Sequence, residues 1–219
     1  MPRPVLAPLR REQILNGLFS VIAQKGFQAC SISDVARASG LARGILHYYF
    51  DSKEEMLAEL MRSLGQVHLR ELDRYLTRFT DPLERLLAVL RFHLSPQDDT
   101  SRDMTRVWIE FWAYGLEDPK VRKAVLEVQD AVRERLESTL DQGLREGRFV
   151  KVDRRSTAVL LLSLVEGPML QRSYHRGVVN AAEILSTASR MILAFLSAGA
   201  KASRPGGRRT LRPARGVHA

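Results

Sequence analysis

One short run of the sequence gathers an unusual number of side chains that could bind a small molecule. Residues 105–115 read TRVWIEFWAYG, which places four aromatic rings and one carboxylate on little more than two turns of a predicted helix. The rings belong to Trp108, Phe111, Trp112 and Tyr114. Aromatic faces beside an acidic group form the environment that attracts organic cations. Each residue alone fits ordinary core packing, but together they indicate a cavity wall.

A second acidic group strengthens this interpretation. Glu166 lies two residues before Pro168, which cannot donate the helical hydrogen bond to the carbonyl of Leu164. Such a bend beside an acid indicates a binding site or a simple kink, and both alternatives stay open. We predict a pocket for a small cationic or amphipathic molecule, with histidines as further polar partners. Its candidate residues are His68, His93, Trp108, Glu110, Phe111, Trp112, Glu166, Met169 and His175.

A different set of polar residues lies near the N-terminus, in SISDVARASGLARGILHYYFDSKEEML (31–57). Two very short helices are predicted here, and helices of two turns need tertiary packing to be stable. Ala36 allows close approach, Gly40 forms the turn, and Leu46 fills the small core between the two helices. This spacing is typical of a helix-turn-helix, whose second helix enters the DNA major groove.

The polar residues that remain fit contact with DNA. Arg43 and Gly44 open the second helix, and His47 and Tyr48 follow one turn later with a ring nitrogen and a hydroxyl. Side chains of these types bind phosphate oxygens and base edges. Lys53 adds a cation in the first turn of the next helix. A helical bundle with aromatic caps is the alternative, and the agreement of spacing, turn and exposed donors favours DNA binding.

The fold must hold these candidate binding residues in position. Helix-capping residues and the spacing of apolar residues predict that it consists of helices alone. Asp81-Pro82 and Asp118-Pro119 combine an N-cap acid with proline at the first helical position. Apolar residues recur every three or four positions, and neither tight hairpin turns nor sustained alternation indicate strands. The chain is predicted to be all-α, with nine helices at about residues 10–25, 32–39, 42–49, 52–76, 82–94, 101–116, 119–146, 154–176 and 181–198.

Composition and charge narrow the function classes only a little. The net charge is +9, but residues 200–219 carry six Lys or Arg and no acid, so much of the excess lies in a Pro/Gly/Arg-rich tail. We predict that this tail is disordered. The single cysteine, Cys30, excludes an internal disulfide, and the N-terminus lacks the pattern of a signal peptide. With no apolar run long enough for a membrane span, we expect a cytoplasmic protein that contacts no membrane.

The segment from Ile14 to Leu60 resembles the DNA-binding signature of the TetR-type transcriptional repressors. The resemblance rests on FSVIAQKGFQACSISDVARASGLARGILHYYFDSKEEML, including the Gly26-Phe27 helix exit and the aromatic run that ends at Phe50. It implies that the DNA-contacting positions are Ser31, Arg43, Gly44, His47, Tyr48 and Lys53. Two residues depart from the family pattern: Ala42 replaces the usual Ser or Thr cap, and His47 replaces the usual Tyr.

The resemblance also implies how the rest of the chain is organised. Residues 1–52 would form the helix-turn-helix domain, 53–199 an effector-binding and dimerisation domain, and 200–219 the basic tail. The helices at 154–176 and 181–198 would pair with those of a second copy, as their wide apolar surfaces also favour. The run WIEFWAYG resembles the subgroup that includes the choline-sensing repressors.

We therefore expect a transcriptional repressor that binds a palindromic DNA operator as a homodimer and is released when a small effector binds. No catalytic motif, metal-ligand cluster or cofactor-binding loop is present, so neither an enzyme nor a cofactor or metal is expected. Two alternatives remain: an architectural DNA-binding protein that uses the basic tail and has no effector, and an all-helical enzyme. The sequence specifies neither the operator nor the effector.

Overall fold

The computed structural model describes residues 6–94, 99–174 and 180–197 of the chain. Within these ranges it contains nine α-helices and no β-strand, which confirms the predicted all-α class. Each predicted helix end lies within four residues of the observed one. The helices are α1 (Leu6–Lys25), α2 (Ile32–Ser39), α3 (Arg43–Tyr49), α4 (Lys53–Leu76), α5 (Pro82–Leu94), α6 (Asp99–Gly115), α7 (Pro119–Arg145), α8 (Arg154–Tyr174) and α9 (Ala181–Ser197).

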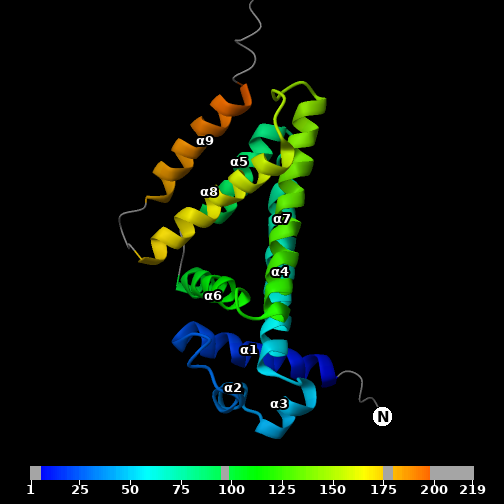
Figure 1. Ribbon diagram of the computed structural model, residues 1–219, viewed down its shortest axis with the longest axis vertical. Helices are drawn as coiled ribbons and strands as arrows, with labels where there is room; N and C mark the ends of the chain where they lie inside the picture. Colours follow the sequence, from blue (N-terminus) through cyan, green and yellow to red (C-terminus); the bar gives the residue numbers. More distant parts are fainter. Residues whose placement is uncertain (1–5, 95–98, 175–179, 198–219) are drawn as a thin grey trace, which may run out of the picture.

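The helices divide into a small head, made of α1, α2 and α3, and a larger body, made of α4 to α9 (Figure 1). Helix α4 begins beside the head and runs along α7 into the body, while α5, α8 and α9 gather at the opposite end. Helix α6 crosses between the head and the lower end of α8 and contacts α1. Two helices, α4 and α6, thus connect the head with the body. No helix of the described residues is long and apolar enough to cross a bilayer.

The two short helices of the head are held by local signals. Ser31 accepts a hydrogen bond from the backbone N–H of Asp34, whose carboxylate accepts one from the backbone N–H of Ser31. This capping box satisfies two N–H groups that would otherwise lack partners at the start of α2. Gly40 ends α2 with φ +67°, in the left-handed region where glycine has no steric penalty. Val35 and Leu46 are buried where α2 and α3 meet.

Helix α3 is anchored from its inner side by Arg11 of α1. The Arg11 guanidinium donates to the backbone carbonyl of Tyr49 at 2.6 Å and to the carboxylate of Glu59 at 2.5 Å. It also lies 4.6 Å from the centre of the Phe50 ring. With Leu46 buried beneath the helix, α3 is fixed by its backbone and its inner face. Its outer face is therefore free to present other side chains.

Helices α4 and α7 pack closely because α4 has a glycine where α7 places a valine. A Cβ atom added to Gly65 would lie only 2.3 Å from Cγ2 of Val128, a distance that real side chains do not reach. Farther along the same pair, Arg135 of α7 donates to the Asp73 carboxylate of α4 at 2.6 Å. The pair runs from the head to the far end of the body (Figure 1).

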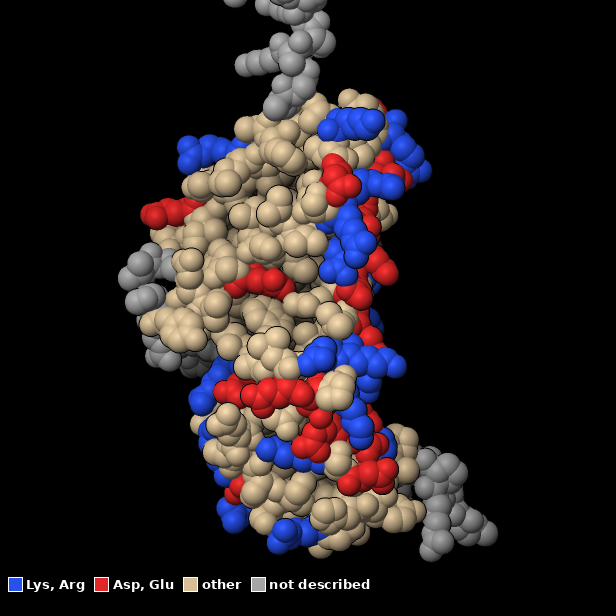
Figure 2. All heavy atoms as spheres, in the orientation of Figure 1, with Lys and Arg blue, Asp and Glu red and all other residues tan. Residues whose placement is uncertain are grey.

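Helices α8 and α9 are apolar on more than the face that they bury. One side of each helix is buried in the core of this chain, through Ala158, Leu161 and Val165 of α8 and Ala188 and Ile192 of α9. The pairing of these two helices with a second copy stays a prediction. The large apolar side chains that are exposed on these helices are Val159, Leu160, Leu170, Tyr174, Met191, Leu193 and Phe195. Figure 2 shows a broad uncharged surface over α8 and α9, whereas charged side chains line the edge formed by α4 and α7.

Candidate functional site

Helix α3 presents most of the predicted DNA-contacting residues on one exposed surface. Arg43, Gly44, His47 and Tyr48 are all exposed, and Tyr48 retains 81% of its accessible area. Their spacing places them on one side of the helix, opposite the buried Leu46. Added bulk at Gly44 would meet nothing within 4 Å, so the space above this turn is open. This surface offers a cation, an imidazole and a phenol, and α3 lies at the lower end of the molecule (Figure 1).

The other two predicted contacts have internal partners as well. Ser31 caps α2, and its hydroxyl lies 2.5 Å from the Asp34 carboxylate. Hydrogen bonds from Lys25 and from Ser31 lower the pKa of Asp34. Lys53, in the first turn of α4, is partly buried and donates from Nζ to the carbonyl of Phe27 at 2.6 Å. Lys53 therefore ties α4 to the exit of α1, with two of its N–H groups left for another acceptor.

The start of α3 differs from that of α2. Ala42 occupies the N-cap position and makes no side-chain hydrogen bond to the first turn, as its residue type requires. The first N–H groups of α3 therefore lack the partner that a Ser or Thr at this position would supply.

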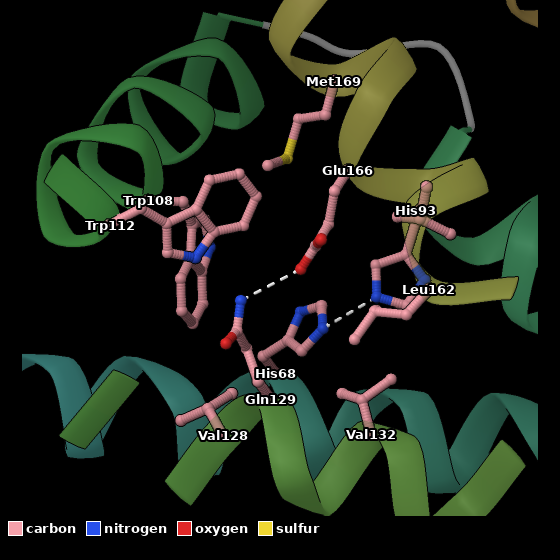
Figure 3. Close-up of a pocket in the computed structure, with 11 residues that line it drawn as sticks. His68, His93, Trp108, Trp112, Val128, Gln129, Val132, Leu162, Glu166 and Met169 are labelled. Carbon is pink, nitrogen blue, oxygen red and sulfur yellow. Dashed lines mark hydrogen bonds between the residues drawn. The ribbon is translucent and has the colours of Figure 1, made fainter. Parts of the chain in front are cut away.

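A cavity that is partly open to solvent lies in the body where α4, α5, α6, α7 and α8 meet. Trp108 and Trp112 project into it from α6, and Glu166 and Met169 from α8 (Figure 3). The lining is mostly apolar with few polar groups, as is usual for small-molecule sites. Its residues are His68, His93, Trp108, Trp112, Val128, Gln129, Val132, Leu162, Val165, Glu166 and Met169.

Glu166 is the only carboxylate among these lining residues. Its Oε1 accepts a hydrogen bond from Gln129 Nε2 at 3.0 Å. Burial raises the pKa of Glu166, and the hydrogen bond from Gln129 opposes this shift. Figure 3 shows the carboxylate between the two indole rings and the histidines. A partly desolvated acid beside aromatic faces is a favourable site for a positive charge.

Two histidines form the wall across from the tryptophans. The Nε2 atoms of His68 and His93 are 3.0 Å apart, and the His68 ring centre lies 5.7 Å from that of Trp108. Burial lowers the pKa of His68 to about 3, with smaller contributions from His93 and Arg135. Burial also lowers the pKa of His93. Both imidazoles are therefore neutral at physiological pH.

Three predicted pocket residues are not among the residues that line the cavity. Glu110 turns toward the head, where its Oε2 accepts a hydrogen bond from the backbone N–H of Phe27 at 3.0 Å. Phe111 packs edge-on against the Phe27 ring at 4.9 Å. Neither of them lines the cavity. His175 lies outside the described residues.

Five residues that line the cavity were not predicted from the sequence: Val128, Gln129, Val132, Leu162 and Val165. The valines and the leucine belong to apolar stripes that look like ordinary core. Gln129 carried a usable signal, because it is a polar residue next to the apolar stripe of α7. Among the described residues, no group of three His, Cys, Asp or Glu side chains could hold a metal ion.

The cavity and the head are linked through α6. Arg106 donates to the carbonyl of Ala23 at the end of α1 at 3.0 Å. One turn later Glu110 accepts from the N–H of Phe27, and Tyr114 Oη donates to Glu54 of α4 at 3.2 Å. These three side chains alternate along α6 with Trp108 and Trp112 of the cavity. A displacement of α6 at the cavity would therefore act directly on the head.

Comparisons with known proteins agree with a small N-terminal head and a larger C-terminal body. The family model described as bacterial regulatory proteins of the tetR family matches residues 14–60. The model described as the C-terminal part of BetI-type transcriptional repressors matches residues 82–197, which is more than half of the chain. The transcriptional regulator BetI of Stenotrophomonas maltophilia is 28% identical over 186 residues, which cover 83% of this chain and 90% of that protein.

Solved structures with low sequence identity share the fold. A transcriptional regulator from Saccharomonospora viridis, in complex with choline, superimposes with a TM-score of 0.75 at 24% identity and covers 84% of this chain and 96% of its own. The regulator FadR from Bacillus subtilis, in complex with stearoyl-CoA, gives a TM-score of 0.72 at 17% identity and covers 84% and 97% of the two chains.

Proposed function

The chain belongs to the TetR family of transcriptional regulators and has the C-terminal domain of BetI-type repressors, and on this premise we propose that a small organic cation controls its binding to DNA. The cation occupies the cavity of the body, and DNA is bound by the outer face of α3. The observation that carries the proposal is that α4 and α6 each place residues both in the cavity wall and against the head. The proposal assigns no catalytic step to the chain.

The DNA-binding part is supported by the exposed face of α3. In this proposal Arg43 binds a guanine edge or a phosphate, and His47 and Tyr48 bind phosphates or bases beside it. Two copies of the chain would present two such faces to successive major grooves, which matches a palindromic operator with half-sites about one helical turn apart. The exposed apolar side chains of α8 and α9 supply the surface for that homodimer.

We propose domain limits of 1–52 for the DNA-binding part, 53–199 for the effector-binding and dimerisation part, and 200–219 for a basic tail. Helix α4 begins at Lys53 and carries His68 in the cavity wall, so it belongs to the second part while contacting the first. The tail lies outside the described residues.

The effector part is supported by the chemistry of the lining. Trp108 and Trp112 offer aromatic faces, and Glu166 supplies a negative charge, whereas none of the described lining residues is a Lys or Arg. A ligand with a net negative charge would meet the Glu166 carboxylate and no cationic side chain among these residues. The choline complex of the Saccharomonospora viridis regulator shows that a protein of this fold holds such a cation.

The mechanism follows from the two connecting helices. A cation held between α6 and α8 favours one position of α6, which the contacts of Arg106 and Glu110 pass to the end of α1. Helix α4 adds a second connection through Lys53 and Phe27. The effector lowers DNA affinity because it binds more tightly to the arrangement in which the two α3 helices do not match the half-site spacing. The size of the loss is set by the difference in effector affinity between the two arrangements.

The test begins with selection of bound duplexes from a random pool at stated salt, followed by titration of the selected duplex. We expect Arg43→Ala and Tyr48→Ala to remove most of the preference over competitor DNA, while Arg145→Ala at the far end of α7 leaves it intact. Deleting residues 200–219 should also preserve it. The proposal fails if the α3 variants keep the preference, or if the tail deletion abolishes it.

A thermal-shift screen tests the effector separately. We expect quaternary and smaller organic ammonium ions to raise the melting temperature and to release the selected duplex, and fatty acids to do neither. Stabilisation by fatty or aromatic acids with no response to ammonium ions would refute the cationic effector and leave the DNA-binding part standing.

A further inference from the structure

The last turn of α3 ends in backbone carbonyl groups that a helix cannot satisfy by itself, and α1 supplies a partner for one of them. The Nη2 atom of Arg11 donates to the carbonyl oxygen of Tyr49 at 2.6 Å. The Nη1 atom of the same guanidinium donates to the Glu59 carboxylate of α4 at 2.5 Å, and its carbon lies 4.6 Å from the centre of the Phe50 ring. One side chain therefore joins α1, the end of α3 and α4.

This contact completes the attachment of α3 to the rest of the head. The start of α3 is tied to α2 by the turn at Gly40, and Leu46 is buried beneath its middle. Helix α2 is itself held by α1, because Gln13 Nε2 donates to the carbonyl of Ser39 at 2.6 Å. A short helix that is held at its start and its middle can still tilt at its far end. The bond from Arg11 removes this freedom.

The ion pair between Arg11 and Glu59 contributes little to the stability of the fold. Their side chains retain 36% and 33% of their accessible areas, and ion pairs that are this exposed to solvent stabilise proteins only weakly. The head also has an apolar core of its own, in which Ile14, Leu18 and Phe27 are fully or almost fully buried. Loss of the pair should therefore change the orientation of α3 more than it changes folding.

We propose that Arg11 is a positioning residue for sequence-specific DNA binding, and that it sets the angle between α3 and α4 through the carbonyl of Tyr49 and the carboxylate of Glu59. This angle determines where His47 and Tyr48, in the last turn of α3, meet the DNA. Arg11 itself does not contact DNA, because both of its terminal nitrogens donate to acceptors within the head. The inference rests on the proposed function, since it concerns the same DNA-binding face, and it adds a residue from outside α3.

A direct contact between Arg11 and a DNA phosphate is the alternative, and Arg11→Lys separates the two roles. Lysine keeps the positive charge, so it would preserve most of a phosphate contact. Its single nitrogen does not reproduce the planar fork that serves two acceptors at once, nor the stacking of that fork on an aromatic ring. The positioning role therefore predicts a loss in Arg11→Lys, although the charge of the head is unchanged.

The test measures binding of the full chain to two duplexes by fluorescence anisotropy at one stated salt concentration. One is the duplex that the wild-type chain selects from a random pool, and the other has the same base pairs in scrambled order. We expect Arg11→Lys to lower affinity for the selected duplex at least about 5-fold, the ratio that a loss of about 1 kcal/mol in base contacts produces. Affinity for the scrambled duplex should change less than about 2-fold, and the melting temperature should stay within about 4 °C.

Glu59→Ala tests the same role through the sign of its effect. Removing a negative charge from the head strengthens its attraction to phosphates, so charge alone predicts tighter DNA binding. Loss of the acceptor that holds Arg11 predicts the opposite, a decrease of at least about 3-fold for the selected duplex. The matched control is Glu12→Ala, because Glu12 is an exposed acid of α1 that makes no hydrogen bond or ion pair within the described residues. It should leave this affinity unchanged or slightly higher.

The inference requires a loss of affinity for the selected duplex in both variants. Unchanged or tighter binding of that duplex by either folded variant overturns the inference and leaves the proposed function intact. An equal loss for the selected and scrambled duplexes in Arg11→Lys also overturns it, because the effect would then not depend on sequence. If one variant fails to fold, the other decides alone. A wild-type chain that prefers no duplex overturns the proposed function together with the inference.

Discussion

Replacing Glu166 by glutamine removes a charge from the cavity while keeping its shape. The Oε1 atom that accepts from Gln129 at 3.0 Å is retained, so the local hydrogen bond persists. Two unit charges about 4 Å apart interact by about 4 kcal/mol at an effective dielectric constant of ~20. Desolvation of both charges offsets part of this. We therefore expect Glu166→Gln to weaken binding of a cation by about 1.5–3 kcal/mol, or roughly 10- to 150-fold.

The same substitution should act in the opposite direction on the unliganded protein. Burial raises the pKa of Glu166 in the folded chain, so its charged form is disfavoured there. This penalty is absent at acid pH and develops as the pH rises through the ordinary pKa of a glutamate, so at pH 7 the substitution removes it. We expect a small increase in the melting temperature of unliganded Glu166→Gln at pH 7 that disappears at pH 3.

The assays are calorimetric titration with choline and thermal unfolding at the two pH values. Glu127→Gln provides the control, because Glu127 is an exposed acid that pairs with Arg62 at 2.9 Å outside the cavity. It should change cation affinity less than 2-fold, within about 0.4 kcal/mol. Unchanged choline affinity in Glu166→Gln, or a loss of stability at pH 7 that persists at pH 3, would refute this reasoning.

The remaining predictions concern packing, coupling and assembly. Gly65→Ala forces a Cβ against α7 and should lower the free energy of unfolding by about 1–3 kcal/mol in urea titrations, whereas Gln66→Ala, at the exposed neighbouring position of α4, should change it by less than about 0.5 kcal/mol; equal effects would contradict the close packing. Glu110→Ala removes the acceptor for the N–H of Phe27 and should leave cation affinity within about 3-fold while reducing cation-induced release of DNA, measured by fluorescence anisotropy. Normal release would show that this contact transmits nothing. Met191→Asp places a charge on the exposed apolar face of α9 and should shift the chain toward a monomer in light scattering without unfolding it; an unchanged mass would exclude this face from the dimer.

The sequence was sufficient for the helices because their boundaries depend on local signals. Asp118 accepts from the N–H groups of Lys120 and Val121, as its place before Pro119 predicted. Gly26, Gly40 and Gly147 adopt positive φ at helix ends. Such signals act within a few residues, so they are visible without knowledge of the tertiary structure.

The cavity was only partly predictable, because neighbouring residues on one helix serve different surfaces. Trp108 and Trp112 are four apart and share a face, whereas Glu110 is rotated by about 200° from Trp108. Periodicity could separate these faces, but only the tertiary structure shows which of them meets the head. The same limit applies to α8, which is apolar on two sides and buries only one of them in this chain.

The way Arg11 and Leu46 hold α3 from behind has a consequence for how such a regulator could acquire new target genes. Since the anchoring contacts use the backbone of Tyr49 and the inner face of the helix, the identities of residues 43, 47 and 48 are uncoupled from the stability of the fold. With the DNA contacts proposed above, mutation at these positions can change the preferred operator sequence while the chain keeps folding. The outer face of α3 can then vary independently of the rest of the molecule.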